Sequence, residues 1–164
     1  MHADTLPVQL LGGRVPTDRA DDWNAIKYVL AQLKDTWDRG DAAAYARCFS
    51  ADAVYVIFVG TVYVGRADIE RSHEALFTKF AKGTTTFLTV LDVRFHGPDT
   101  ATVLTTGDAA KRPPRAGRGK VQSFTFHRGP DGWECVAFHN TKRSPLMERI
   151  SFHMDRRFRP DHTT

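Results

Sequence analysis

The sequence is poor in cysteine and contains no long hydrophobic run. Only Cys48 and Cys135 occur in 164 residues, without a Cys-x-x-Cys pair, so neither a disulfide framework nor a cysteine-ligated zinc site is predicted. No apolar run approaches the ~20 residues that a membrane-spanning helix requires. The first residues also lack the basic and apolar regions of a signal peptide. We therefore expect a cytoplasmic protein that makes no membrane contact.

The motifs of the common cofactor and metal sites are also missing. The sequence has no Gly-x-Gly-x-x-Gly after a strand, no phosphate-binding loop and no Gly-x-Ser-x-Gly nucleophile elbow. Its seven histidines never occur as His-x-His or His-x-x-x-His, the spacings that place two imidazoles on one metal. We expect no metal and no cofactor. The composition, 41% hydrophobic and 26% charged, is that of one globular domain.

The positive charge is confined to two segments. Residues 109–121 carry five basic side chains and no acid, and residues 142–159 carry six against Glu148 and Asp155. The net charge is +4, so the rest of the chain is acidic. This distribution favours a solvated basic loop and tail on an acidic body. Contact with an anion or a nucleic acid is the alternative interpretation, and we expect no nucleic-acid partner.

Apolar residues recur at helical spacing in the first half of the chain. After an extended arm over 1–20, a first helix is predicted to begin at Asp21 or Asp22 and to end at Gly40. Asp41 is the expected cap of a short second helix. Residues 50–52 are predicted to interrupt the regular secondary structure after it. Asp68 is the expected cap of a third helix. That helix has an apolar stripe of Ile69, His73, Leu76, Phe77 and Phe80.

The second half of the chain is rich in Thr, Val and Phe, as strands are. A hairpin is predicted over 53–64, followed by strands at 84–96, 100–107, 120–128 and 133–141. Runs of helix followed by runs of strand predict an α+β fold, with three helices on one face of a curved antiparallel sheet. The expected organisation is an arm (1–20), one domain (21–142) and a basic tail (143–164). A short helix is predicted in the tail.

Several short motifs carry a family resemblance. They are WDRGDA at 37–42, FSADA at 49–53, GRADI at 65–69, DGW at 131–133 and FHNT at 138–141. In this order and spacing they resemble the nuclear-transport-factor-2-like superfamily, within its SnoaL-like branch, and specifically the SgcJ/EcaC group. The resemblance implies a cone-shaped α+β barrel around a hydrophobic pocket, and homodimers formed through the sheet. Its members include cofactor-free cyclases and isomerases, polyketide-tailoring proteins, and modules that only bind or assemble.

The acid–base residues of catalytic relatives do not transfer to this chain. The aspartate that acts as base in the ketosteroid-isomerase relatives would fall at Ile57, and a hydrocarbon cannot accept a proton. The polyketide-cyclase relatives use an aspartate on a late strand, where the two predicted last strands hold only Glu134. A steroid-isomerase mechanism is therefore not expected.

Three polar residues are the candidate catalytic groups. His73 lies in an otherwise apolar helical stripe, and its side chain has an unperturbed pKa near neutrality. It acts either as an acid–base group in the pocket or as a hydrogen-bonded structural histidine, and Glu70 is its nearest same-face acid. His139 and Asn140 are neighbours on the last strand, so only one of them faces the cavity unless a bulge intervenes. The sequence does not distinguish between them.

Aromatic side chains are the candidate ligand contacts. Six of them lie on stripes expected to point inward, and a cavity lined by them suits a flat, aromatic, polyketide-like ligand. These residues are Trp37, Tyr45, Tyr55, Phe77, Phe87 and Phe124. The expected function is cofactor-free proton shuttling on an apolar oxygenated substrate, that is, isomerisation, cyclisation or dehydration. The alternative is a module of the same fold that binds or assembles without catalysis.

Overall fold

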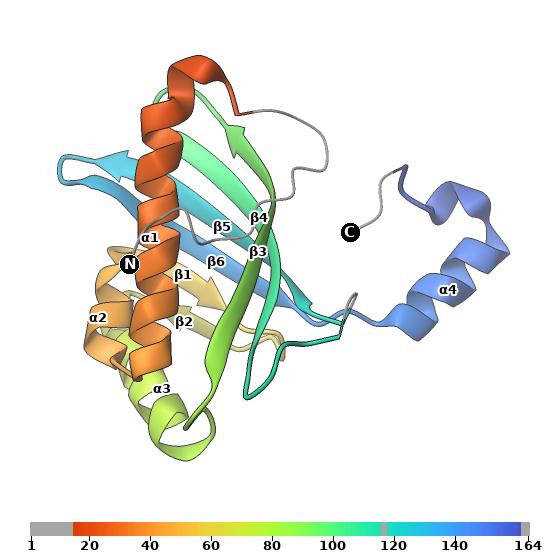
Figure 1. Cartoon of the computed structure of the whole chain (residues 1–164), viewed down its shortest axis with the longest axis horizontal. Helices are drawn as coiled ribbons and strands as arrows, with labels where there is room; N and C mark the ends of the chain where they lie inside the picture. Colours follow the sequence, from red (N-terminus) through yellow and green to blue (C-terminus); the bar gives the residue numbers. More distant parts are fainter. Residues whose placement is uncertain (1–14, 116–117, 162–164) are drawn as a thin grey trace.

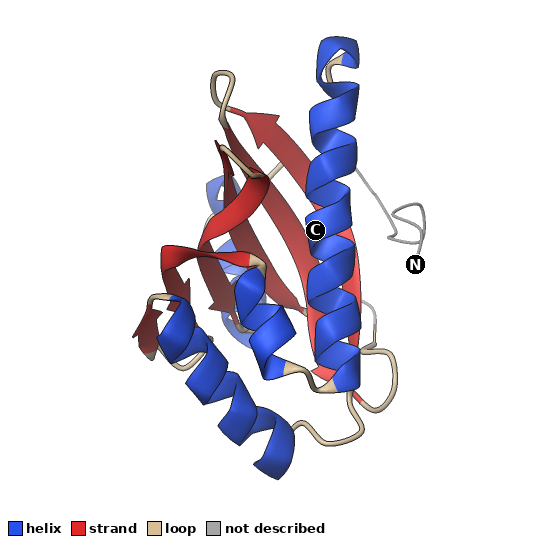
Figure 2. Ribbon diagram, turned by 90° about the vertical axis from the view of Figure 1, so that its left-hand side faces the viewer, coloured by secondary structure: helices blue, strands red, loops and turns tan. Residues whose placement is uncertain are grey.

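A curved sheet of six strands forms one side of the molecule, and α1, α2 and α3 cover its inner face (Figures 1 and 2). The structure is a computed structural model that describes residues 15–115 and 118–161. The strand order is β2-β1-β6-β5-β4-β3. The elements in chain order are η2 (Thr17–Arg19), α1 (Ala20–Arg39), α2 (Ala42–Arg47), β1 (Phe49–Val56), β2 (Val62–Val64), α3 (Arg66–Lys79), β3 (Thr85–Phe95), β4 (Thr100–Ala110), β5 (Lys120–Gly129), β6 (Gly132–Thr141), α4 (Pro145–Met154) and η3 (Arg156–Phe158). The α+β architecture confirms the predicted fold class.

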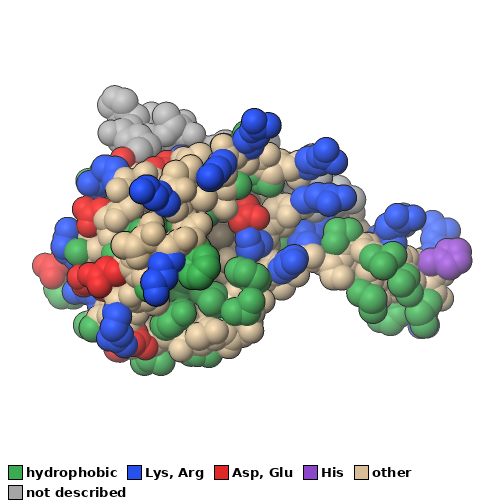
Figure 3. All heavy atoms as spheres, turned by 90° about the horizontal axis from the view of Figure 1, so that it is seen from below, with side chains coloured by type: hydrophobic (Ala, Val, Ile, Leu, Met, Phe, Trp, Pro, Cys, Tyr) green, Lys and Arg blue, Asp and Glu red, His purple; other side chains and the backbone are tan. Residues whose placement is uncertain are grey.

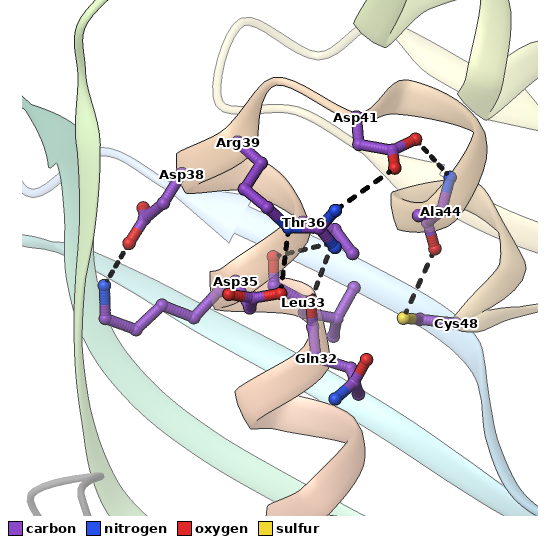
Figure 4. Close-up of polar contacts among 10 residues, drawn as sticks. Gln32, Leu33, Asp35, Thr36, Asp38, Arg39, Asp41, Ala44 and Cys48 are labelled. Carbon is purple, nitrogen blue, oxygen red and sulfur yellow. Dashed lines mark hydrogen bonds and ion pairs between the residues drawn. The ribbon is translucent and has the colours of Figure 1, made fainter. Parts of the chain in front are cut away.

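The junction between α1 and α2 follows the sequence signals. Gly40 ends α1 in the left-handed conformation, at φ 67°, and donates its N–H to the Trp37 carbonyl, as glycine does at helix ends. The Asp41 carboxylate accepts the Ala44 N–H at 2.9 Å and so caps α2 (Figure 4). Arg39 forms ion pairs with both Asp35 and Asp41. This short turn fixes α2 beside the end of α1.

The start of α3 differs from the prediction. Gly65, at φ 84°, is the residue before the helix, and Asp68 lies inside its first turn. Asp68 reaches back to accept the Val64 N–H at 3.2 Å and pairs with Arg71. The carboxylate thus gives the Val64 N–H an acceptor. In the first turn it also interacts favourably with the positive end of the helix dipole. Asp68 therefore stabilises the helix start without being its cap.

The sheet is mixed: β1 runs parallel to β6, and all the other neighbouring strands of the sheet are antiparallel. Only antiparallel strands were predicted, since a parallel pair between distant segments leaves no local signal in the sequence. The predicted break at 50–52 lies inside β1, and there the pairing with β6 is irregular, between Phe49 and Val54. The Ser50 hydroxyl donates to Asp52 at 3.0 Å within this irregular stretch.

A bulge in β6 decides which of its side chains point inward. Thr125 pairs with Ala137, whereas the next residue, Phe126, pairs with Cys135. Val136 is therefore an extra residue, and the alternation of faces shifts by one at this point. Cys135 lies on the inner face before the bulge, and Phe138 lies on it afterwards; both are buried.

The core lies between the inner face of the sheet and the helices. Ile26 and Leu30 of α1, Ile69 of α3, and Val103 and Phe126 of the sheet are fully buried. Along α1 the apolar residues recur every three or four positions, which is the period of a helix. They pack against every second residue of the strands, which is the period of a strand. The buried sheet residues are continuous with the helical ones in one cluster.

The helix α4 lies apart from the rest of the domain and packs mainly against η3 (Figure 1). Its Leu146, Ile150 and Met154 form the predicted stripe, and all three are exposed. Among the residues that the structure describes, no helix has the length and apolar character needed to cross a bilayer.

Two apolar truncations should distinguish the core from α4. Phe126→Ala is expected to lower the free energy of unfolding by about 3–5 kcal/mol, because it opens a cavity in the packed core. Ile150→Ala is expected to change it by less than about 0.5 kcal/mol, because Ile150 is 43% exposed and outside the core cluster. Urea unfolding of both variants checks this. An equal loss in both would contradict the arrangement.

Candidate active site

A cavity of about 460 Å³ opens between the helices and one end of the sheet. Its lining comes from α1, α2 and α3, and from the ends of strands that lie side by side. Viewed from that end, the surface is hollowed, with hydrophobic and charged side chains beside the hollow (Figure 3). A concave site that combines an apolar lining with a few polar groups is the usual form of a small-molecule pocket.

The inner part of the cavity is aromatic. The Tyr45 and Tyr55 hydroxyls hydrogen-bond to each other at 3.0 Å. The Tyr55 ring lies against Phe138 of β6, with ring centroids 4.4 Å apart. Packed rings of this kind hold one another in fixed orientations and give a flat ligand broad contact. The lining aromatic residues of this part are Trp37, Tyr45, Tyr55, His73, Phe124 and Phe138.

His73 lies within this aromatic group. Its ring stacks on Tyr45, with centroids 4.4 Å apart, and meets Trp37 and Tyr55 edge-on at 5.6 and 5.2 Å. Nδ1 donates to the Ile69 carbonyl at 2.8 Å, one helical turn earlier, and the side chain is only 3% exposed. With the proton on Nδ1, the lone pair of the neutral ring lies on Nε2. The hydrogen bond to Ile69 therefore sets the tautomer.

Burial keeps the titratable groups of this part neutral. Desolvation lowers the pKa of His73 to about 4, although its hydrogen bond to Ile69 acts in the opposite direction. Desolvation also raises the pKa of Tyr45 and that of Tyr55 well above the usual tyrosine range. At pH 7 the imidazole is thus an acceptor at Nε2, and both phenols keep their protons.

The outer part of the cavity is polar. Gln122 and Asn140 project from β5 and β6. The side-chain oxygen Oε1 of Gln122 accepts a hydrogen bond from the Thr105 hydroxyl at 3.0 Å. Asn140 Oδ1 and Thr86 Oγ1 are buried and have no hydrogen-bond partner on the described chain. Buried polar atoms are almost always paired. Two unpaired ones in the lining of one cavity therefore indicate a surface that meets a polar ligand or water.

The structure separates His139 from Asn140. Asn140 lines the cavity, whereas His139 lies on the opposite face and is exposed. Strict alternation along β6 would place Trp133 and Cys135 on the same face as His139. The bulge at Val136 shifts the alternation between Cys135 and His139, so His139 faces the other way. His139 is therefore not part of the candidate site.

The predicted ligand contacts divide in the same way. Trp37, Tyr45, Tyr55 and Phe124 line the cavity. Phe77 packs edge-on against Trp37, with centroids 5.1 Å apart, and supports the lining from behind. Phe87 is outside the lining, because its neighbours on β3, Thr86 and Leu88, face the cavity. Ile57 also lines the cavity, so the position of the steroid-isomerase base is filled by a hydrocarbon.

The cavity lining also contains polar residues that were not among the predicted site residues, namely Thr86, Gln122, Asp108 and Lys120. Lys120 and Gln122 lie at alternate positions of β5, on the same face as the buried Phe124. This alternation is the sequence signal that could have identified them as inward-facing residues. Asp108 pairs with Lys120, whose ammonium also lies 5.0 Å from the centre of the Phe58 ring. Within residues 15–115 and 118–161, no group of three or more His, Cys, Asp or Glu side chains could hold a metal ion.

The depressed pKa of His73 makes the stability of the protein depend on pH. The unfolded histidine titrates near pH 6.5, so between that value and about pH 4 the unfolded state binds the extra proton. The free energy of unfolding should therefore fall as the pH drops through this window, by about 3 kcal/mol from this group. His73→Phe should remove that part of the dependence. Urea unfolding at pH 7.5 and 4 checks it. The same loss in both proteins would refute the assignment.

Comparison with known proteins places this architecture in a family. A family model described as a SnoaL-like domain matches residues 18–139. No curated protein sequence is similar enough to count as a relative. The finer resemblance to the SgcJ/EcaC group stays a prediction.

Solved structures agree with the family match. A domain of unknown function with a cystatin-like fold from Nostoc punctiforme is 28% identical, with a TM-score of 0.70 over 87% of this chain and 89% of that one. A nuclear-transport-factor-2-like protein from Novosphingobium aromaticivorans is 27% identical, with a TM-score of 0.58 over 74% and 82%. A proposed dehydratase of that superfamily from Streptomyces avermitilis is 21% identical, with a TM-score of 0.59 over 75% and 97%, and it shows the fold alone. With most of its domain matched, the chain belongs to the SnoaL-like domain family, on a nuclear-transport-factor-2-like fold.

Proposed function

We propose that this protein is a cofactor-free, small-molecule enzyme that moves a proton on an apolar oxygenated substrate of polyketide type. The observation that carries the proposal is the placement of His73 at the wall of an aromatic cavity, with its tautomer set by Ile69. A neutral imidazole with a free Nε2 lone pair is a general base. Isomerisation, cyclisation and dehydration of enolisable substrates all begin with such a proton transfer.

The low pKa of His73 restricts the substrates that it can serve. A base whose conjugate acid has a pKa of about 4 removes protons only from acidic carbons, because the driving force of the transfer follows the pKa difference. The carbon between two carbonyl groups is such a site. Asn140, on the polar side of the cavity, would hold a substrate oxygen through its carboxamide while the proton leaves for Nε2. A 1,3-dicarbonyl compound attached to an aromatic ring fits both parts of the cavity.

The second candidate function is binding without catalysis. The hydrogen bond from Nδ1 to Ile69 and the near-complete burial of the ring are also what a structural histidine shows. In that case the cavity would sequester the same class of ligand. The two functions differ in whether a bound ligand exchanges its proton faster than in buffer.

Keto–enol interconversion of benzoylacetone tests the proposal, because the enol absorbs strongly in the ultraviolet. The wild-type protein should accelerate the interconversion, with a rate that rises through about pH 4 and stays level above it. His73→Phe should remove the acceleration, by about 10²-fold or more, with benzoylacetone affinity nearly intact. His139→Phe is the matched control and should behave as wild type, since His139 faces away from the cavity.

Three results would count against catalysis. Binding of benzoylacetone with interconversion at the buffer rate would leave the binding module as the function. Equal loss of rate in the His73 and His139 variants would remove His73 as the base. A failure of benzoylacetone to bind would contradict both functions for this substrate class.

A further inference from the structure

Three polar side chains form a row across the inner face of the sheet. Thr105 of β4 pairs in register with Gln122 of β5, and Gln122 pairs with Asn140 of β6. Residues in register on neighbouring strands point to the same face. Thr105 is fully buried, and Gln122 and Asn140 line the cavity. The row is thus anchored inside the sheet at one end and opens to the cavity along the rest.

The anchor fixes what the row presents. The Thr105 hydroxyl donates to Gln122 Oε1 at 3.0 Å, so the amide oxygen of Gln122 is occupied and its N–H groups are the free part. Asn140 Oδ1 is a buried acceptor with no partner on the described chain. Neighbouring positions therefore offer a donor from Gln122 and an acceptor from Asn140. A ligand group that meets both must carry an acceptor and a donor side by side.

The charges of the cavity are paired or suppressed. Lys120 pairs with Asp108, and Lys34 pairs with Asp38, which also accepts the Thr86 N–H. Burial keeps His73 and the two tyrosines neutral. A charged ligand group would have to break one of these pairs or be buried without a counter-charge, and either is costly. The cavity therefore discriminates against carboxylates and amines.

We propose that Gln122 and Asn140 are the specificity-determining residues of this cavity, and that they select an uncharged aromatic ligand with an acceptor and a donor side by side. A carbonyl beside a hydroxyl or N–H is such a group. The ligand carbonyl accepts from Gln122, and its donor bonds to Asn140 Oδ1. The inference rests on the proposed function, to which it adds a ligand class. The enol form of a 1,3-dicarbonyl compound carries both groups, on carbons separated by one other carbon, and presents them to the protein once its internal hydrogen bond opens.

Three matched naphthalenes test the selection, and calorimetry gives their dissociation constants. 2-Naphthamide carries the acceptor and the donor, 2-naphthoate replaces them with a charge, and 2-methylnaphthalene has neither. The wild-type protein should bind 2-naphthamide at least about 10-fold more tightly than either other compound. An apolar ligand loses affinity when it displaces water that it cannot replace with hydrogen bonds of its own.

The variants assign this preference to the row. Asn140→Leu and Gln122→Leu should each weaken 2-naphthamide binding by about 10-fold or more, while 2-methylnaphthalene binding is unchanged or tighter. Ser123→Ala and His139→Ala are the controls. These two residues pair with each other and are the sequence neighbours of Gln122 and Asn140, so their side chains lie on the opposite face of the sheet. Both should keep the wild-type preference. Thermal melting verifies that all four variants fold, and Asn140→Ala, which also removes the acceptor, is used if Asn140→Leu does not fold.

The outcomes separate this inference from the proposed function. Equal affinity for all three naphthalenes, or tighter binding of 2-naphthoate, overturns the donor–acceptor selection but leaves the role of His73 to the benzoylacetone assay. A parallel loss of 2-naphthamide and 2-methylnaphthalene in the Asn140 and Gln122 variants also overturns it, because the row would then only shape the cavity. Failure of every naphthalene to bind overturns this inference together with the proposed aromatic pocket.

Discussion

The extra residue that β6 carries at Val136 sets the chemistry of the cavity. Before it, Trp133 and Cys135 point inward and pack in the core; after it, Phe138 and Asn140 point inward and line the cavity. If the same residues continued from Cys135 in unbroken alternation, His139 would point inward and Asn140 outward. A histidine would then stand where the sheet now offers a carboxamide. The bulge thus determines that the sheet side of the cavity presents an amide.

The helix side of the site depends on a different constraint. An imidazole with no hydrogen-bond partner would be costly to bury among aromatic rings, and the Ile69 carbonyl supplies that partner for Nδ1. The same hydrogen bond prevents the ring from presenting Nδ1 to a ligand. Burial then fixes the charge at zero over the physiological range. The fold and the proposed chemistry therefore require the same state of His73, and acid conditions act against both.

Local signals in the sequence were enough for most of the fold. Gly40 and Asp41 end and begin helices as expected, and the long strands fall near their predicted bounds. Their physical basis is short-range, in backbone conformation, capping and alternation. Asp68 shows the limit of such signals, because the same carboxylate can cap a helix or stabilise its first turn. The parallel pairing of β1 with β6 could not be predicted, since its partners are distant in the chain.

The site was predictable only in part, for the same reason. His73 and the aromatic lining follow from helical and strand periodicity, which survive into the structure. The choice between His139 and Asn140 depended on a bulge, and a bulge has no reliable signature in a single sequence. Gln122 and Thr86 were passed over because an uncharged polar residue in a strand is ordinary on an exposed face. Only the hydrogen bond from Thr105 to Gln122 and the position of Gln122 and Thr86 in the cavity lining give these residues a role.

The two polar atoms of the cavity that lack a partner on the described chain have opposite effects on the stability of the fold and on ligand recognition. A buried acceptor left without any partner costs about 1–3 kcal/mol. Neither Thr86 Oγ1 nor Asn140 Oδ1 has a partner on the described chain, so each depends on water or a ligand for one. Apolar residues of similar volume at these places would relieve the cost and favour the folded state. They would also turn the polar side of the cavity into an extension of its aromatic side. The groups that make the lining less stable are thus the ones able to tell an oxygenated ligand from a hydrocarbon.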